Sequence, residues 1–120
     1  DVKVLTRQGA NPRRSLDIVV TQRSADLFLG VPFNLASYSL LCYTIADQLD
    51  MSPGVLVWNG GDVHVYETHM EAVQTQLDRS PYALPVVQFK QQTSIDTLTF
   101  EDILLMNYVS HDILKGEVAV

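Results

Sequence analysis

The sequence has very little cysteine, few basic side chains and no long apolar run, and each shortage excludes a class of protein. Cys42 is the only cysteine among the 120 residues, so the chain cannot form an internal disulfide, as is typical of reduced, cytosolic proteins. No stretch approaches the roughly 20 consecutive apolar residues of a transmembrane helix. The N-terminus also lacks the apolar region of a signal peptide. We therefore expect a soluble, cytoplasmic protein that does not enter a membrane.

Positive charge and metal ligands are scarce as well. Eight Lys and Arg stand against 14 Asp and Glu, which gives a formal net charge of −6. General nucleic-acid binding needs many basic groups to neutralise phosphates, so we do not expect it, and any phosphate must be recognised locally. The histidines lack the short spacing of zinc ligands, with His69 and His111 as singletons, so no metal is expected. There is no phosphate-binding loop, nucleophile elbow or dinucleotide fingerprint.

What is present is a globular pattern, since 47% of the residues are hydrophobic and apolar periodicity continues along the chain. It predicts the following elements in order: a turn at 9–15, a strand at 15–22, a helix at 34–49, a strand at 55–58, a turn or bulge at the "NGG" of 59–61, a strand at 62–66, a helix at 67–78, a strand at 86–90, and a turn or short helix followed by a strand at 103–108. The fold class is α+β, a single domain with a mixed or mostly antiparallel sheet packed on one central helix. Apolar residues surround that helix, so we expect it to be covered on several sides.

The stretch "QRSADLFLGVPFN" places polar side chains at fixed positions within an apolar segment. Arg23 and Ser24 are a suitable pair for a phosphate, because a guanidinium donates two parallel hydrogen bonds and the hydroxyl adds a third. Alternatively, Arg23 bridges to Asp26 or another carboxylate and Ser24 caps a turn. Asp26 could accept from the ring N–H groups of a ligand, or cap the turn that follows it. On these residues alone both interpretations stay open.

Three further side chains could recognise a ligand. The amide of Asn34 offers a donor beside an acceptor, which matches the edge of uracil and mismatches that of cytosine; as an N-cap of the helix it would need no ligand. His64 and Tyr66 are two apart on a strand and point to one side. They could meet a sugar hydroxyl, although a buried His–Tyr hydrogen bond is the commoner arrangement.

Taken together, "QRSADLFLGVPFNLASYSLL", "VWNGGDVHVYETHMEAVQTQLDRSPYALP" and the terminal "KGEVAV" resemble thymidylate synthase from about residue 15 to residue 120. The resemblance implies a homodimeric methyltransferase of dTMP biosynthesis that acts on dUMP with 5,10-methylenetetrahydrofolate as co-substrate. It assigns Arg23 and Ser24 to the phosphate, Asn34 to the uracil edge, and His64 with Tyr66 to the ribose 3′-hydroxyl. The full dUMP-binding set it implies is Arg23, Ser24, Ala25, Asp26, Asn34, His64 and Tyr66. For the folate it implies Asp26, Gly30 and the closing C-terminal residues Ala119 and Val120. The apolar residues between these polar groups would form the wall of a closed pocket.

The family's nucleophilic cysteine has no counterpart in this sequence. In the family it lies in a Pro-Cys-His stretch that would fall at or ahead of Asp1, and Cys42, in the central helix, cannot replace it. The resemblance therefore implies that residues 1–120 are the C-terminal portion of a single thymidylate synthase domain, with Asn34 assisting the reaction. Two alternatives remain open, a deoxyuridylate hydroxymethylase, in which water replaces hydride, and an inactive nucleotide-binding or dimer-forming module. The tail "NYVSHD" also departs from the family's Tyr-Asp-Pro-His-Pro pattern.

A family dimer packs a sheet from each subunit, so some strand residues should be apolar on the outer side. Ile18, Val20, Leu104 and Met106 are the candidates, although ordinary core packing explains them equally well.

Overall fold

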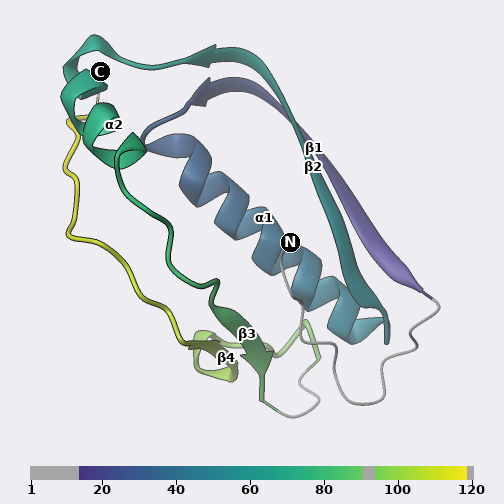
Figure 1. Ribbon diagram of the computed structural model, residues 1–120. Coiled ribbons are helices and arrows are strands. Elements are labelled where there is room, and N and C mark those ends of the chain that lie inside the picture. Colours follow the sequence, from purple (N-terminus) through teal and green to yellow (C-terminus); the bar gives the residue numbers. More distant parts are fainter. Residues whose placement is uncertain (1–13, 91–93, 119–120) are drawn as a thin grey trace.

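The computed structural model describes residues 14–90 and 94–118, which form an α+β arrangement, as the sequence predicts (Figure 1). The elements are β1 (Ser15–Asp26), α1 (Gly30–Gln48), β2 (Ser52–His64), the 3₁₀ turn η1 (Glu67–His69), α2 (Met70–Leu77), β3 (Val86–Phe89), the 3₁₀ turn η2 (Phe100–Asp102) and β4 (Ile103–Met106). The strands form two separate two-stranded sheets rather than one. β1 pairs with β2 in parallel, and β3 pairs with β4 antiparallel.

The β1–α1–β2 unit is the main structural feature. Parallel strands need a long crossover connection, and here α1 provides it while packing against both strands, as Figure 1 shows. The register runs from Ser15 opposite Ser52 to Asp26 opposite His64. The carboxyl ends of both strands therefore meet at one edge, next to the first turn of α1.

β2 continues through the glycines for which the sequence pattern predicts a turn or bulge, so that prediction was wrong. Gly60 and Gly61 lie within the strand, and both are required by close approaches rather than by a change of direction. A Cβ on Gly61 would lie 2.7 Å from the carbonyl oxygen of Arg23, and one on Gly60 would meet the Trp58 ring. β1 is likewise longer than predicted and ends at Asp26 rather than at residue 22.

Helix α1 begins at Gly30, so the predicted start at residue 34 was wrong, and the alternative in which Asn34 is the N-cap does not apply. Leu29 is the N-cap, and it makes no side-chain capping bond. Pro32 fits in the first turn because its missing N–H would have had no intrahelical partner there. The helix ends in a Schellman motif, in which the N–H of Met51 donates to the Ala46 carbonyl over 2.9 Å. Asp50 takes the left-handed position of that motif, at φ 52°.

Near its C-terminal end α1 is covered on more than one side, as the sequence predicts, because Cys42 and Thr44 are both buried although they lie about 200° apart around the helix. The buried helix residues are Val31, Cys42, Thr44 and Ala46. Phe33, in the first part of the helix, stays 74% exposed.

The faces of the β1–β2 sheet also differ from expectation. Val20 is buried, since it faces α1, and so belongs to the core rather than to an outer surface. The outer face instead carries Val19 opposite Val57, at 67% and 43% exposure, with Val55 at 60%. Ile18 is half-buried.

The rest of the described chain is more extended. The segment predicted as a helix at 67–78 is the turn η1 followed by α2, and the strand predicted at 103–108 ends at Met106. In Figure 1, α2 and the C-terminal segment lie near the start of α1, while β3 and β4 lie towards its other end. The side chain of Gln48 accepts from the Ile95 N–H over 3.0 Å at that other end. None of the described helices is long and apolar enough to cross a bilayer.

Candidate functional site

Most of the predicted site residues converge at one edge of the β1–β2 sheet. Ser24 and Asp26 lie at the carboxyl end of β1, opposite Asp62 and His64 of β2, and Asn34 lies on α1, which begins directly beyond β1. In open α/β units, ligands bind outside the carboxyl ends of parallel strands, beside the helix that follows. The βα turn is therefore the natural place for a ligand in this fold.

A hydrogen-bonded relay fixes the amide of Asn34. The indole Nε1 of Trp58 donates to Gln22 Oε1 over 3.0 Å, and Gln22 Nε2 donates to Asn34 Oδ1 over 2.9 Å. Since an indole N–H can only donate, it determines which end of the Gln22 amide carries oxygen. Gln22 in turn determines the orientation of Asn34, whose Nδ2 is left without a partner among the described residues.

The βα turn is shaped by Asp26, as one of the two interpretations predicts. Its Oδ1 accepts from the backbone N–H of Phe28 over 3.0 Å and from that of Leu29 over 3.3 Å. Its Oδ2 has no partner in the described part of the chain. Gly30 follows, and a Cβ there would meet Asp26 Cβ at 3.6 Å and Asn34 Oδ1 at 3.7 Å, which is ordinary contact distance. No steric need within the described chain therefore explains this glycine.

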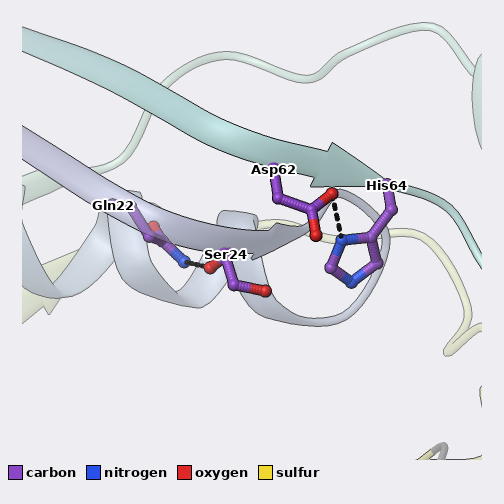
Figure 2. Close-up of polar contacts among 4 residues, drawn as sticks. All are labelled: Gln22, Ser24, Asp62 and His64. Carbon is purple, nitrogen blue, oxygen red and sulfur yellow. Dashed lines mark hydrogen bonds and ion pairs between the residues drawn. The ribbon is translucent and has the colours of Figure 1, made fainter.

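Arg23 and Ser24 are both exposed, and they point to opposite faces because they are consecutive on a strand. Arg23 forms no ion pair with Asp26 or with any other described carboxylate, so the bridge considered above does not form there. Ser24 uses its backbone carbonyl to accept from Gln22 Nε2 over 3.0 Å, as Figure 2 shows. Its hydroxyl makes no hydrogen bond within residues 14–90 and 94–118. The two side chains that could hold an anion thus have no side-chain partner among the described residues.

His64 and Tyr66 lie side by side, but they do not form the buried hydrogen bond that was the alternative. Their rings meet edge to face, with centroids 5.1 Å apart. Both reach solvent, since the His64 side chain is 29% exposed and Tyr66 37%. His64 Nδ1 faces Asp62 Oδ1 at 3.5 Å (Figure 2). This contact orients the ring weakly, because Asp62 is well exposed.

The apolar residues of this stretch are divided between the core and the surface. Phe28 and Ala25 are buried, with Ala25 completely inaccessible, whereas Leu27 and Phe33 are 43% and 74% exposed. Only part of the apolar residues of this stretch is therefore packed into the core, and the others reach solvent. Two other predicted residues, Ala119 and Val120, lie outside the described residues, as does most of the predicted turn at 9–15.

Cys42 is a packed thiol, as the sequence suggests. Burial raises its pKa, and the nearby Asp17 carboxylate adds to that effect, while a backbone hydrogen bond at Gly54 opposes it. Its Sγ lies 3.4 Å from the Leu16 carbonyl oxygen, to which it donates. A nucleophilic cysteine needs a thiolate, which low pKa favours, so Cys42 is poorly suited to nucleophilic attack.

Gln22 and Trp58 belong to the site although the sequence did not predict them. Gln22 directly precedes Arg23, so its position was visible, but the bond to Trp58 depends on the parallel register that brings Gln22 opposite Gly60. No group of three or more potential metal ligands occurs among the residues that the structure describes.

Comparison with known proteins decides the family. The sequence profile of the thymidylate synthases matches residues 2–120. This chain belongs to the thymidylate synthase family. The thymidylate synthase of Mycoplasma pneumoniae is 50% identical over 99 residues, covering 82% of this chain and 34% of that protein. Those of Coxiella burnetii and Francisella tularensis are 48% and 46% identical over 106 residues, covering 88% of this chain and 40% and 39% of theirs.

The chain thus spans little more than a third of the length of these thymidylate synthases. Membership agrees with the resemblance drawn from the sequence.

Proposed function

We propose that this chain is the nucleotide-recognising portion of a thymidylate synthase that converts dUMP to dTMP. The observation that carries the proposal is the relay from Trp58 through Gln22 to Asn34, because it gives the Asn34 amide a fixed direction. Oδ1 has two lone pairs, so it can accept from Gln22 and from the uracil N3–H together. The free Nδ2 donates to the uracil O4. The chain belongs to a family whose relatives carry the name of this enzyme.

The same relay selects against cytosine. Cytosine presents an acceptor at N3 and a donor at its exocyclic amine, so Asn34 would have to turn its amide over to match it. In that orientation Nδ2 would face Gln22 Nε2, and two donors would oppose each other. Gln22 cannot turn over in response without losing the Trp58 N–H. Discrimination of this kind is efficient, since a buried polar group left unpaired is costly.

The remaining contacts follow from the free groups at the βα edge. Arg23 and Ser24 bind the 5′-phosphate, which requires local twisting of the end of β1 to bring both to one anion. His64 and Tyr66 bind the ribose 3′-hydroxyl. Asp26 Oδ2 accepts from the pterin of 5,10-methylenetetrahydrofolate, and Gly30 leaves space for that ring. When bound, the folate supplies the methylene group and the hydride, and the nucleophilic cysteine belongs to a part of the enzyme outside residues 1–120.

The proposal includes a homodimer. The outer face of the β1–β2 sheet is apolar and exposed at Val19, Val55 and Val57, which is the surface that a second sheet would cover. Val57→Asp should convert a dimer of the intact polypeptide to a monomer in sedimentation velocity. If the wild-type polypeptide is already a monomer, Val57→Asp will leave its sedimentation coefficient unchanged, and that result would contradict the proposed interface.

The central test compares dUMP with deoxyuridine in the intact natural polypeptide. Arg23→Ala should weaken dUMP binding by about 10- to 100-fold, the range of a lost charge-assisted hydrogen-bond pair, and leave deoxyuridine nearly unaffected. Lys90→Ala is the matched control, because it removes one positive charge near the β3–β4 sheet. An equal loss for both ligands would show that Arg23 does not hold the phosphate.

Product analysis separates the alternatives. Formation of dTMP from dUMP and methylenetetrahydrofolate supports the proposal, whereas hydroxymethyl-dUMP would identify the hydroxymethylase. Binding of dUMP without any product would identify an inactive module.

A further inference from the structure

His69 is the most deeply buried large side chain among the described residues, and the proposed dUMP contacts make no use of it. It is 1% exposed and lies at the junction of η1 and α2, where its backbone N–H donates to the Tyr66 carbonyl over 2.9 Å. Its ring packs between two others, with centroid distances of 5.1 Å to Phe28 and 5.7 Å to Tyr66. Phe28 belongs to the βα turn and Tyr66 to the proposed ribose site. His69 therefore touches both halves of the candidate site from behind.

The third neighbour of His69 is the C-terminal segment. Its Nε2 lies 2.8 Å from the Glu117 carbonyl oxygen. The backbone at Gly116 passes directly over the ring, since a Cβ there would lie 2.9 Å from Nε2 and 3.0 Å from Phe28 Cε1. A buried ring, a backbone in van der Waals contact with it and a hydrogen bond all meet at one point of an otherwise exposed segment.

The protonation of His69 follows from these contacts. A carbonyl oxygen can only accept, so Nε2 must carry the proton and donate it to Glu117. Nδ1 is buried and has no partner among the described residues. A proton on Nδ1 would therefore have no described acceptor, and the geometry favours the neutral Nε2–H tautomer.

We propose that His69 is a positioning residue that attaches residues 115–118 to the back of the nucleotide site. The inference rests on the proposed function in one respect: Tyr66 and the βα turn, which the His69 ring contacts, belong to the nucleotide site proposed above. Through these ring contacts His69 links residues 115–118 to that site.

The attachment can be tested by proteolysis without any substrate. Trypsin can cut after Lys115 only when the bond to Gly116 leaves the His69 ring, so the cleavage rate reports the population of the detached state. His69→Phe keeps a ring between Phe28 and Tyr66 but removes the donor. In the intact natural polypeptide it should speed this cleavage about tenfold, the effect of a lost hydrogen bond. His69→Gln places an amide N–H where Nε2 was and should stay within about twofold of the wild type.

Two controls make the result specific. Cleavage after Lys90 in the same digest is the reference for a lysine that the His69 contacts do not involve, and its rate should not change. His111→Phe is the matched histidine substitution, because His111 also donates to a backbone carbonyl, that of Ser80 over 2.9 Å, but it is exposed. It should leave cleavage after Lys115 nearly unchanged. Equal rates in His69→Phe and wild type, or equal acceleration in His111→Phe, would overturn the proposal.

Where His69→Phe fails to fold, the wild type alone still decides the matter. A long-range ¹H–¹⁵N spectrum should show His69 with a protonated Nε2 and a bare Nδ1, and the opposite tautomer would refute the attachment. In steady-state kinetics, His69→Phe should raise the KM for the folate about tenfold, with the Kd for dUMP unchanged. A faster cleavage without that KM change would support the attachment and overturn its role at the nucleotide site. An inactive wild type would overturn the proposed function and leave the proteolysis result intact.

Discussion

Replacing Trp58 by phenylalanine should weaken the discrimination between dUMP and dCMP without removing nucleotide binding. The substitution deletes the N–H that donates to Gln22 Oε1 over 3.0 Å, while the aromatic ring still covers much of the same surface. Losing this half-buried hydrogen bond costs about 1 kcal/mol. Together with the bond from Gln22 Nε2 to the Ser24 carbonyl, that energy keeps the Gln22 amide in one orientation, so its loss makes it easier for Gln22 and Asn34 to turn over together. The ratio of the two dissociation constants should fall about fivefold, since 1.4 kcal/mol is about tenfold.

The assay is isothermal titration of the intact natural polypeptide with each nucleotide. Gln22→Glu gives a second and stronger perturbation that leaves Trp58 in place. A carboxylate accepts from Trp58 but cannot donate to Asn34 Oδ1, so the Asn34 amide must turn its Nδ2 towards it. The preference for dUMP should therefore fall further than in Trp58→Phe. An unchanged ratio in both variants, with normal thermal unfolding, would refute the relay as the source of specificity.

Three further predictions concern stability and reactivity. Gly61→Ala should lower the free energy of unfolding by about 1–3 kcal/mol in urea titrations, because its Cβ would lie 2.7 Å from a β1 carbonyl that cannot move aside. Gly30→Ala is the matched control and should leave stability unchanged. Equal losses of stability in the two variants would contradict the steric explanation. Cys42 should react with a disulfide reagent at least about tenfold more slowly than free cysteine. Its reaction rate should rise at higher pH than that of an ordinary thiol, because burial raises its pKa. Denaturant should abolish both differences, and fast reaction of the native protein would show that the thiol is not packed. The Thr99 N–H and hydroxyl donate to Asp102 and lower its pKa. The contribution of the Asp102 carboxylate to stability is therefore present above its pKa in the unfolded state and is lost as the pH falls through the lower pKa of the folded state. Asp102→Asn should flatten the acid unfolding curve over that pH range, and a curve identical to that of the wild type would show that the bonds to Thr99 contribute nothing to stability.

The sequence allowed the elements and most of the site residues to be predicted where local patterns govern them. Alternating burial identifies the first half of β1, since its side chains face α1 and the outer surface in turn. The polar types at Arg23, Asn34 and His64 suggested nucleotide recognition from the sequence alone. Three of the predicted positions, Ser24, Asp26 and His64, are brought to one edge by the register of β1 and β2.

Other features depend on contacts between segments distant in the sequence. Gly60 and Gly61 resemble a turn locally, but they continue a strand because the neighbouring backbone and the Trp58 ring need the space of a side chain. The start of α1 was misplaced because Asp26, and not Asn34, satisfies the N–H groups before the helix. Local propensity cannot supply such information, since it resides in the tertiary arrangement.

The histidine at the back of the site shows the same limit from another side. In the sequence His69 has no motif around it and no partner at useful spacing. Its significance comes from Gly116 and Glu117, which lie far along the chain and reach it only in the folded state.

The parallel pairing of β1 with β2 also has a consequence for the order of folding. No β1–β2 bond can form as a hairpin, because the first pair already joins Ser15 to Ser52 with all of α1 between them. The chain must close this long loop before strand pairing contributes any stabilising free energy, and such non-local closure slows folding. A partly formed α1 shortens the search by bringing the two strands within reach, so the helix and both strands should gain protection from hydrogen exchange in one kinetic step. During synthesis, β1 then cannot pair with β2 until β2 has left the ribosome.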